Sequence, residues 1–404
     1  MDWLLVTEPG PPHERRVGIP HGRVAALGLI TIAAYGGWFY SFGVLLDPII
    51  SDTGWSEAAV AAVFGSSAVI AAFGSLLGGW LLDRLGSRLV FASGAILGAG
   101  SLFVAAGSAR PAVFAVAGAI AGGVLASLGF YHVTQTTAVR ISPDDSDRAI
   151  AVLTIWGAFA SAIYIPMTAW LVTRFDWRFT LRVIAVTVFA AFMAGAVLID
   201  TRHRRSSPPP IFGAVGGALR QPRGRRLMVS QVLAGLGVGT ILVYQVPAMT
   251  AAGLTLAAAS FWAGFRGFAQ LGGRLPLMPM VRRLGVVTSL RLAYLAIAVG
   301  ALALGLADSN MLAAVYALVA GFGIGAVSPL IGMYSRDVFG ETALGTAMGL
   351  VGLGFLLANA AGPILAAMIA ESTGSRALPV LISAAIVAMA AVVVRTGETG
   401  VPAG

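Results

Sequence analysis

Apolar residues gather in long segments along this chain, and polar residues collect in the short stretches between them. A helix that crosses about 30 Å of hydrocarbon needs roughly 20 mainly apolar residues. Twelve segments satisfy this requirement: 23–48, 57–82, 89–107, 112–138, 149–173, 178–199, 227–251, 256–281, 287–306, 311–334, 343–369 and 377–395. The ten-residue alternation of a membrane β-barrel is not seen. The pattern therefore predicts an all-α membrane protein with twelve transmembrane helices.

Composition agrees with this interpretation and excludes several chemistries. Apolar residues make up 58% of the chain and charged residues 11%, whereas soluble domains carry about 25% charged residues. The mean hydropathy is +0.88. There is no cysteine, and the four histidines show no metal-ligand spacing. We therefore expect no metal, no cofactor and no enzymatic activity.

The positive charges indicate how the chain lies in the membrane. Its net charge of +9 comes entirely from arginine, which is placed mainly between apolar segments rather than in a nucleic-acid-binding patch. If the chain starts inside, the cytoplasmic segments hold 18 arginines and the opposite loops hold 4. Because cytoplasmic loops are enriched in positive residues, both termini are expected in the cytoplasm. We expect a multi-pass protein of the cell membrane, typically the bacterial inner membrane, that functions as a monomer and binds no nucleic acid.

The longest polar stretch, an Arg/Pro-rich linker at 201–226, divides the chain into two halves. We predict six-helix bundles at 23–200 and 227–396, with cytoplasmic tails at 1–22 and 397–404. The linker arginines fit either a contact with anionic lipid headgroups or a solvated loop that obeys the charge rule.

The two halves also resemble each other. Gly74–Gly86 reads GSLLGGWLLDRLG and Gly273–Gly285 reads GRLPLMPMVRRLG, 199 positions later. A second pair, ending TRFDWR at Arg178 and ESTGSR at Arg376, has nearly the same offset. Such repeats are typical of secondary transporters, whose substrate site lies near the midplane between them.

The stretch 78–88, GGWLLDRLGSR, resembles the loop motif between helices 2 and 3 of the major facilitator superfamily. The resemblance implies two six-helix bundles that work by alternating access. It also implies a gating role for the motif residues, in which the acid would act near the N-terminus of a neighbouring helix, where negative charge is favoured. The motif residues are Gly79, Asp83, Arg84, Gly86 and Arg88.

Other segments are similar to the monocarboxylate and oxalate–formate transporter-like branch of that family. They are YSFGVLLDPIISDTGWS (Tyr40–Ser56), FDWR (Phe175–Arg178) and AQLGGR (Ala269–Arg274). The chain departs from the branch at two places. Gln270 stands where an aspartate is common, and Asn359 is the polar residue of the eleventh span, where the oxalate–formate branch has a lysine.

Ionisable groups deep in a span point to function, because each costs about 2.5–3.5 kcal/mol to insert. Arg266, Gln270 and Arg274 are spaced four residues apart and form one stripe on the eighth span. A guanidinium binds a carboxylate through two hydrogen bonds. The stripe therefore predicts an organic-anion site, with Arg274 matching the substrate arginine of the branch. Alternatively, an arginine pairs with backbone carbonyls or extends to the membrane surface.

The remaining candidates are polar residues in other spans. Tyr131 and His132 lie at about the depth of Arg274, and His132 is a proton-carrier candidate because its ordinary pKa is near neutrality. It would otherwise be a histidine bonded between helices. Tyr35 and Asn359 are expected to line the cavity or to form interhelical hydrogen bonds.

The sequence thus predicts a secondary transporter for a small, monocarboxylate-like organic anion. Coupling of this transport to protons stays open. Two other functions stay open. One is drug efflux, which needs no arginine in the cavity. The other is a membrane sensor that does not transport, although the short tails leave no room for a signalling domain.

Overall fold

The computed structural model describes residues 19–201, 211–340 and 344–394, and every regular element in these ranges is helical. The predicted tail at 397–404, most of the tail at 1–22 and residues 202–210 of the linker lie outside the described residues. Nine helical stretches of the described chain are long and apolar enough to cross a membrane. Three further helices complete the twelve predicted crossings: α8 (Ser146–Arg174), α12 (Leu256–Arg274) and α16 (Ala377–Val393). The all-α prediction is confirmed.

Several crossings in the first half are built from more than one helix. The first is α1 (His21–Ala34), the π-helix η1 (Tyr35–Tyr40) and α2 (Phe42–Thr53). The second is α3 (Glu57–Leu85). The third is α4 (Ser87–Ser93), the π-helix η2 (Gly94–Ala99) and α5 (Gly100–Gly107). The fourth is α6 (Pro111–Gly129) and α7 (Tyr131–Ile141), and the short η3 (Pro143–Asp145) leads to α8. The sixth is α9 (Trp177–Leu198).

The second half repeats this plan with longer helices. A short helix, α10 (Ile211–Arg220), lies within the predicted linker and is followed by α11 (Pro222–Ala251). After α12 come α13 (Leu277–Gly305), α14 (Asn310–Phe339), α15 (Leu344–Thr373) and α16. Gly285 inside α13 has non-helical angles, so the eighth crossing ends there rather than at residue 281 as predicted. The first part of α13 therefore extends the eighth crossing, and the remainder forms the ninth.

The sequence repeat is visible in the turns. Gly86 and Gly285 are 199 positions apart and share a positive φ, of 79° and 76°, that favours glycine. Gly54 and Gly253 have the same spacing and also have positive φ. The next helices are capped alike, since the hydroxyl of Ser56 accepts from the N–H of Ala59 and that of Thr255 from the N–H of Ala258. The two halves thus begin their second helices with the same local chemistry.

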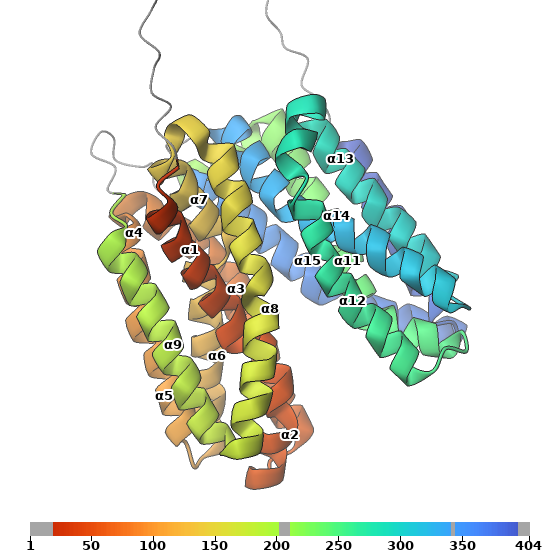
Figure 1. Ribbon diagram of the computed structural model, residues 1–404, viewed down its shortest axis with the longest axis horizontal. Coiled ribbons are helices and arrows are strands. Elements are labelled where there is room, and N and C mark those ends of the chain that lie inside the picture. The colour runs from red at the N-terminus through yellow and green to blue at the C-terminus, as the bar shows by residue number, and fades with distance from the viewer. Residues whose placement is uncertain (1–18, 202–210, 341–343, 395–404) are drawn as a thin grey trace, which may run out of the picture.

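Two cores hold the molecule together. One core cluster is formed by buried residues between 19 and 199. The other is formed by residues between 227 and 394 together with Val139, Ile150 and Ala151 of α7 and α8. We call the two sides of the molecule the Gly86 face and the Gly54 face after their turns. The bundles meet at the Gly86 face and diverge toward the Gly54 face (Figure 1).

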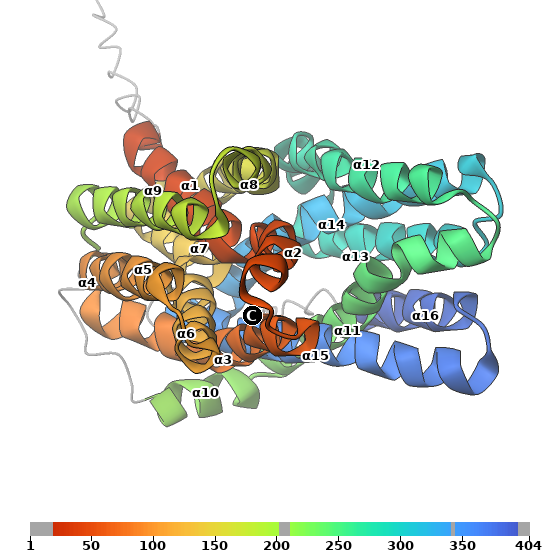
Figure 2. The same cartoon turned by 90° about the horizontal axis from the view of Figure 1, so that it is seen from below.

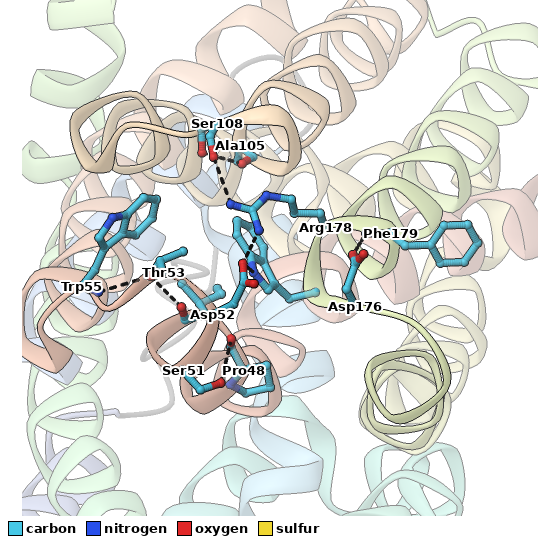
Figure 3. A network of polar contacts seen from close by, with 12 residues as sticks. Pro48, Ser51, Asp52, Thr53, Trp55, Ala105, Ser108, Asp176, Arg178 and Phe179 are labelled. Atoms are coloured by element: carbon cyan, nitrogen blue, oxygen red, sulfur yellow. Dashed lines mark hydrogen bonds and ion pairs between the residues drawn. The ribbon is translucent and has the colours of Figure 1, made fainter.

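At the Gly54 face a polar clasp closes the first bundle (Figure 3). The indole N–H of Trp177 donates to a carboxylate oxygen of Asp52 at 2.8 Å, and Arg178 forms an ion pair with the same carboxylate. The guanidinium of Arg178 also lies 4.2 Å from the Trp177 ring centre and donates to the Ser108 carbonyl. The clasp joins two of the segments that carry the family resemblance, so these residues tie α2 to α9.

Candidate functional site

Arg274 lies at the end of α12, where the two bundles meet. Its side chain is buried, Nε donates to the carbonyl of Gly325 at 3.3 Å, and Nη1 donates to the carbonyl of Thr154 at 3.0 Å. One acceptor belongs to α14 and the other to α8. The guanidinium therefore joins the bundles through backbone carbonyls, which is the alternative that the sequence left open for an arginine in this span. Its substrate role stays a prediction.

Arg266 lies two turns earlier on α12 and has a different environment. Its Nε donates to Oε1 of Gln245 at 3.1 Å, and the hydroxyl of Tyr316 donates to the same oxygen at 2.7 Å. The Nε2 of Gln245 is fixed by the carbonyl of Leu242. The Nη1 of Arg266 is buried and has no hydrogen-bond partner among the described residues. A buried guanidinium nitrogen without an acceptor is costly, so an acceptor from a ligand would be favoured there.

Gln270, between the two arginines, packs closely on α14 through its backbone. A Cβ atom on Gly325 would lie 2.1 Å from the Gln270 carbonyl oxygen, so glycine is required at that contact. The Gln270 side chain is half-buried. The three residues of the predicted stripe all lie in α12 but make different contacts, and their common role in binding stays a prediction.

The first bundle holds an aromatic group at two irregular places in its helices. Tyr35 begins the π-helix η1, and its ring stacks on Phe130 with centroids 3.8 Å apart. Phe130 separates α6 from α7 with extended angles, and Tyr131 follows it. The hydroxyl of Tyr131 lies against Gly157 of α8, one turn from Thr154, whose carbonyl accepts from Arg274. The ring centres of Tyr35 and Tyr131 are 5.3 Å apart, so both residues of the predicted site lie beside the α8 segment that Arg274 contacts.

His132 supplies a hydrogen bond to a backbone carbonyl that the break between α6 and α7 leaves without its helical partner. Its Nε2 lies 2.9 Å from the carbonyl oxygen of Ser127, so this nitrogen carries the proton and donates. A continuous helix would pair that carbonyl with the Tyr131 N–H, four residues on. The Nδ1 of His132 faces Gly352 of α15 in the other bundle, 3.8 Å from where a Cβ would stand. One ring nitrogen of His132 thus stabilises the helix break, and the other lies where the two bundles meet, which we call the seam.

Asn359 lies in α15 away from the stripe. Its Nδ2 donates to the carbonyl of Gly235 in α11 at 3.4 Å. Both helices belong to the second bundle, so this contact is the interhelical hydrogen bond that was the alternative to a cavity role.

The motif residues form a buried polar contact between the bundles. Asp83 is buried, its Oδ1 accepts from the N–H of Gly345 at 3.0 Å, and its Oδ2 accepts from both the N–H and the hydroxyl of Thr346. Arg140 forms an ion pair with the same carboxylate and donates to the Leu82 carbonyl. Gly345 and Thr346 are in the first turn of α15, where the helix dipole favours a negative charge.

The other motif residues surround this contact. Gly79 touches the backbone of Gly345, since a Cβ on Gly79 would lie 1.9 Å from the Gly345 carbonyl oxygen. Gly86 supplies the positive φ that ends α3. Arg84 and Arg88 are exposed, and Arg84 lies 5.1 Å from the ring centre of Trp80.

A second polar contact joins the bundles at the same face. Arg336 of α14 forms ion pairs with Asp147 at 2.7 Å and Asp337 at 2.8 Å, and donates to the Ser146 hydroxyl. Ser146 and Asp147 are 199 positions before Gly345 and Thr346, so both contacts use the first turn of equivalent helices. The charges are exchanged, because here the acid is on the helix and the arginine comes from outside. Burial raises the pKa of Asp147 despite the nearby arginine.

A family model described as Major Facilitator Superfamily matches residues 27–244 and 227–402. The chain belongs to the major facilitator superfamily. The family consists of transporters that work within the lipid bilayer on small molecules, which accords with the absence of enzyme motifs. No curated protein matches the sequence.

Solved structures show the same superfamily fold. The human organic anion transporter MFSD10 (TETRAN) is 17% identical with a TM-score of 0.74, covering 95% of this chain and 100% of its own. FucP, a Major Facilitator Superfamily transporter solved in the outward conformation, is 13% identical with a TM-score of 0.74, covering 93% and 99%. A bacterial homologue of the iron transporter ferroportin, solved in an outward-facing state, is 17% identical with a TM-score of 0.72, covering 93% and 98%.

Three features of this superfamily member were missed in the sequence. Phe130 and Tyr40 complete the aromatic group, and the glycines at 36, 37 and 129 are the local signal that could have indicated the breaks beside them. Tyr316 orients Gln245 from α14, 71 positions away. Arg140 and Thr346 complete the Asp83 contact. Only the 199-residue offset would have indicated Ser146 and Asp147 as the counterparts of Gly345 and Thr346.

Proposed function

We propose that the protein is a secondary transporter that moves a small organic anion by alternating access of its two bundles. The observation that carries the proposal is the guanidinium of Arg266. No described carboxylate forms an ion pair with Arg266 or Arg274, and Arg266 keeps a buried nitrogen without an acceptor. An unpaired positive charge at this depth is costly to insert into the membrane, so it points to a function, and binding of an anionic ligand is such a function.

In this proposal each bundle contributes one wall of the site. Arg266 binds the carboxylate, while Gln270 and Arg274 add polar groups along α12. Tyr35 and Tyr131 form the opposite wall. Asn359 is the weakest member, because its side chain bonds within the second bundle. A ligand with one carboxylate fits this single unpaired cationic group better than a ligand with two separated charges.

The geometry of the bundles supports the rest of the cycle. They meet at the Gly86 face through Asp83 and Arg336 and diverge at the Gly54 face (Figure 1). With the Gly86 face and both termini in the cytoplasm, as the arginine distribution favours, this state opens outward in the bacterial inner membrane. Gating by Gly79, Asp83, Arg84, Gly86 and Arg88 would then release the cytoplasmic side. Protonation of His132 at the seam is our proposal for any proton coupling.

The test replaces Arg266 in protein reconstituted into liposomes. A hydrogen bond to a charged group contributes about 1.5–3 kcal/mol, so Arg266→Gln should weaken carboxylate binding by about 10- to 150-fold. Arg291→Gln is the control, because Arg291 is an arginine of the same bundle that lies in α13 outside the site, where it donates to the backbone carbonyl of Ala391. Saturable uptake of labelled monocarboxylates and ligand-induced thermal shifts give the two measurements.

Three outcomes would contradict the proposal. Normal carboxylate uptake by a folded Arg266→Gln variant would remove the site assignment. Efflux of uncharged drugs that ignores both the variant and added carboxylates would favour a drug transporter. Ligand binding without any flux would favour a sensor.

A further inference from the structure

The short helix α10 has an apolar side that the protein covers only in part. Its sequence, IFGAVGGALR, places Phe212, Val215, Ala218 and Leu219 on one side and glycines with Arg220 on the other. Ala218 is buried, and its carbonyl packs against Gly224. Phe212, however, is 87% exposed and Leu219 is 41% exposed. The described residues therefore leave Phe212 mostly uncovered and Leu219 partly uncovered.

Four arginines lie where this helix meets α11. Arg220 ends α10, and Arg223, Arg225 and Arg226 are in the first turns of α11. All four side chains are exposed, and none forms an ion pair with a described carboxylate. The start of a helix disfavours positive charge, and this turn has no acidic residue to offset it. The arrangement costs stability unless an anion lies nearby.

The position of α10 indicates what that anion is. It connects the end of α9 to the start of α11 on the Gly86 face, so it lies at the depth where transmembrane helices end. Figure 2 shows α10 at the edge of the molecule, outside both bundles, where lipid rather than protein would adjoin it. Helices with an apolar side and basic residues lie in membrane interfaces and bind more strongly to anionic lipids.

We propose that α10 and Arg220, Arg223, Arg225 and Arg226 form a docking surface for anionic phospholipid headgroups. Phe212 and Leu219 enter the acyl boundary, and the arginines contact the phosphates of the same leaflet. The glycines at 216 and 217 keep the polar side of the helix thin, and a Cβ at either would meet nothing within 4 Å. This surface is separate from the substrate site and does not depend on which anion is carried.

The test measures which lipid lies next to α10 in the full-length protein. Since the chain has no cysteine, Gly217→Cys can carry a single fluorophore. Reconstituted vesicles then contain either brominated phosphatidylglycerol or brominated phosphatidylcholine at the same fraction. The anionic phosphatidylglycerol should quench the fluorophore more strongly. Each arginine replaced by glutamine should reduce that preference by about fivefold, so Arg220→Gln with Arg223→Gln and Arg225→Gln should remove it. Added salt should also weaken it.

The control removes an equal charge from the opposite face, with Arg110→Gln, Arg174→Gln and Arg376→Gln, and should keep the preference. Equal quenching by the two lipids in the unaltered chain would overturn the proposal, as would a preference that survives loss of the three linker arginines. Binding of soluble glycerol phosphate to the detergent-solubilised protein, with the same arginine dependence, would mean that the surface takes a free anion and would also overturn it.

Discussion

At the scale of single residues, identical side chains in one helix carry out different tasks because their acceptors differ. Arg274 is satisfied by the carbonyls of Gly325 and Thr154, whereas Arg266 shares one amide oxygen and keeps a free nitrogen. A guanidinium has five N–H donors in a fixed geometry. The number of protein acceptors within reach therefore decides whether it joins helices or keeps a donor free for a ligand. Spacing alone treats the two arginines alike.

Gly79 gives a residue-scale prediction. A methyl group there would overlap the Gly345 backbone, so Gly79→Ala should push α3 and α15 apart and weaken closure of the Gly86 face. Spin labels at Arg88→Cys and Arg283→Cys, one in each bundle, should show a larger share of long distances. Gly65→Ala is the matched control in the same helix, because a Cβ there meets nothing within 4 Å. An unchanged distance distribution in Gly79→Ala would show that this close contact does not control the face.

At the scale of elements, breaks in helices position the site. The π-helix η1 and the gap at Phe130 bring Tyr35, Tyr40 and Tyr131 into one aromatic group. Interrupted helices near the membrane midplane expose backbone groups that a regular helix would hide, and His132 satisfies one of them at Ser127. The other end of the first bundle is fixed by the clasp of α2 and α9, which keeps the broken first crossing in place.

The clasp predicts a pH dependence. Hydrogen bonds from Trp177 and Arg178 lower the pKa of Asp52 in the folded protein. A carboxyl group with a lowered folded pKa stabilises the fold above its unfolded pKa, and this contribution is lost as pH falls through the folded value. The melting temperature in detergent should therefore fall more steeply between neutral and acidic pH in the unaltered protein than in Asp52→Asn. Asp308→Asn, an exposed acid at the same face, should behave like the unaltered chain, and parallel curves for all three would refute the prediction.

At the scale of the whole molecule, the Asp83 and Arg336 contacts join the bundles at the Gly86 face. At the Gly54 face, the described residues form no ion pair between the bundles. Asp83 bonds the first turn of α15, and Arg336 bonds the first turn of α8. These turns are equivalent in the repeat, but α15 offers N–H groups to an acid from the other bundle, whereas α8 offers the acid Asp147 to an arginine. Rocking of the bundles must therefore break both contacts before the Gly86 face can open.

Loss of either contact should shift the molecule toward opening at this face. Asp83→Asn and Arg336→Gln should each lengthen the distance between labels at Arg88→Cys and Arg283→Cys by raising the open population several-fold. The double variant should show the combined shift, since the two sites share no partner. Arg148→Gln removes only an exposed ion pair with Asp145 inside the first bundle and serves as control. A closed distribution in the double variant would mean that the remaining contacts between the bundles, such as Ser75 with Gly349 and Gln135 with Ser328, hold the face.

The sequence by itself determined the elements and their duplication, because both are local properties of the chain. Apolar length defines the crossings, and the glycines at 86 and 285 mark equivalent turns wherever the helices go. Tertiary structure decided what the polar residues do. Whether Arg266, Arg274 or Asn359 faces a cavity, a carbonyl or a neighbouring helix depends on acceptors from α8, α11 and α14, and no spacing within one helix encodes them. The helix breaks at Tyr35 and Phe130 have a local signal in the glycines at 36, 37 and 129. Tertiary packing decided which rings meet there, since Tyr35 stacks on Phe130 from another crossing of the same bundle.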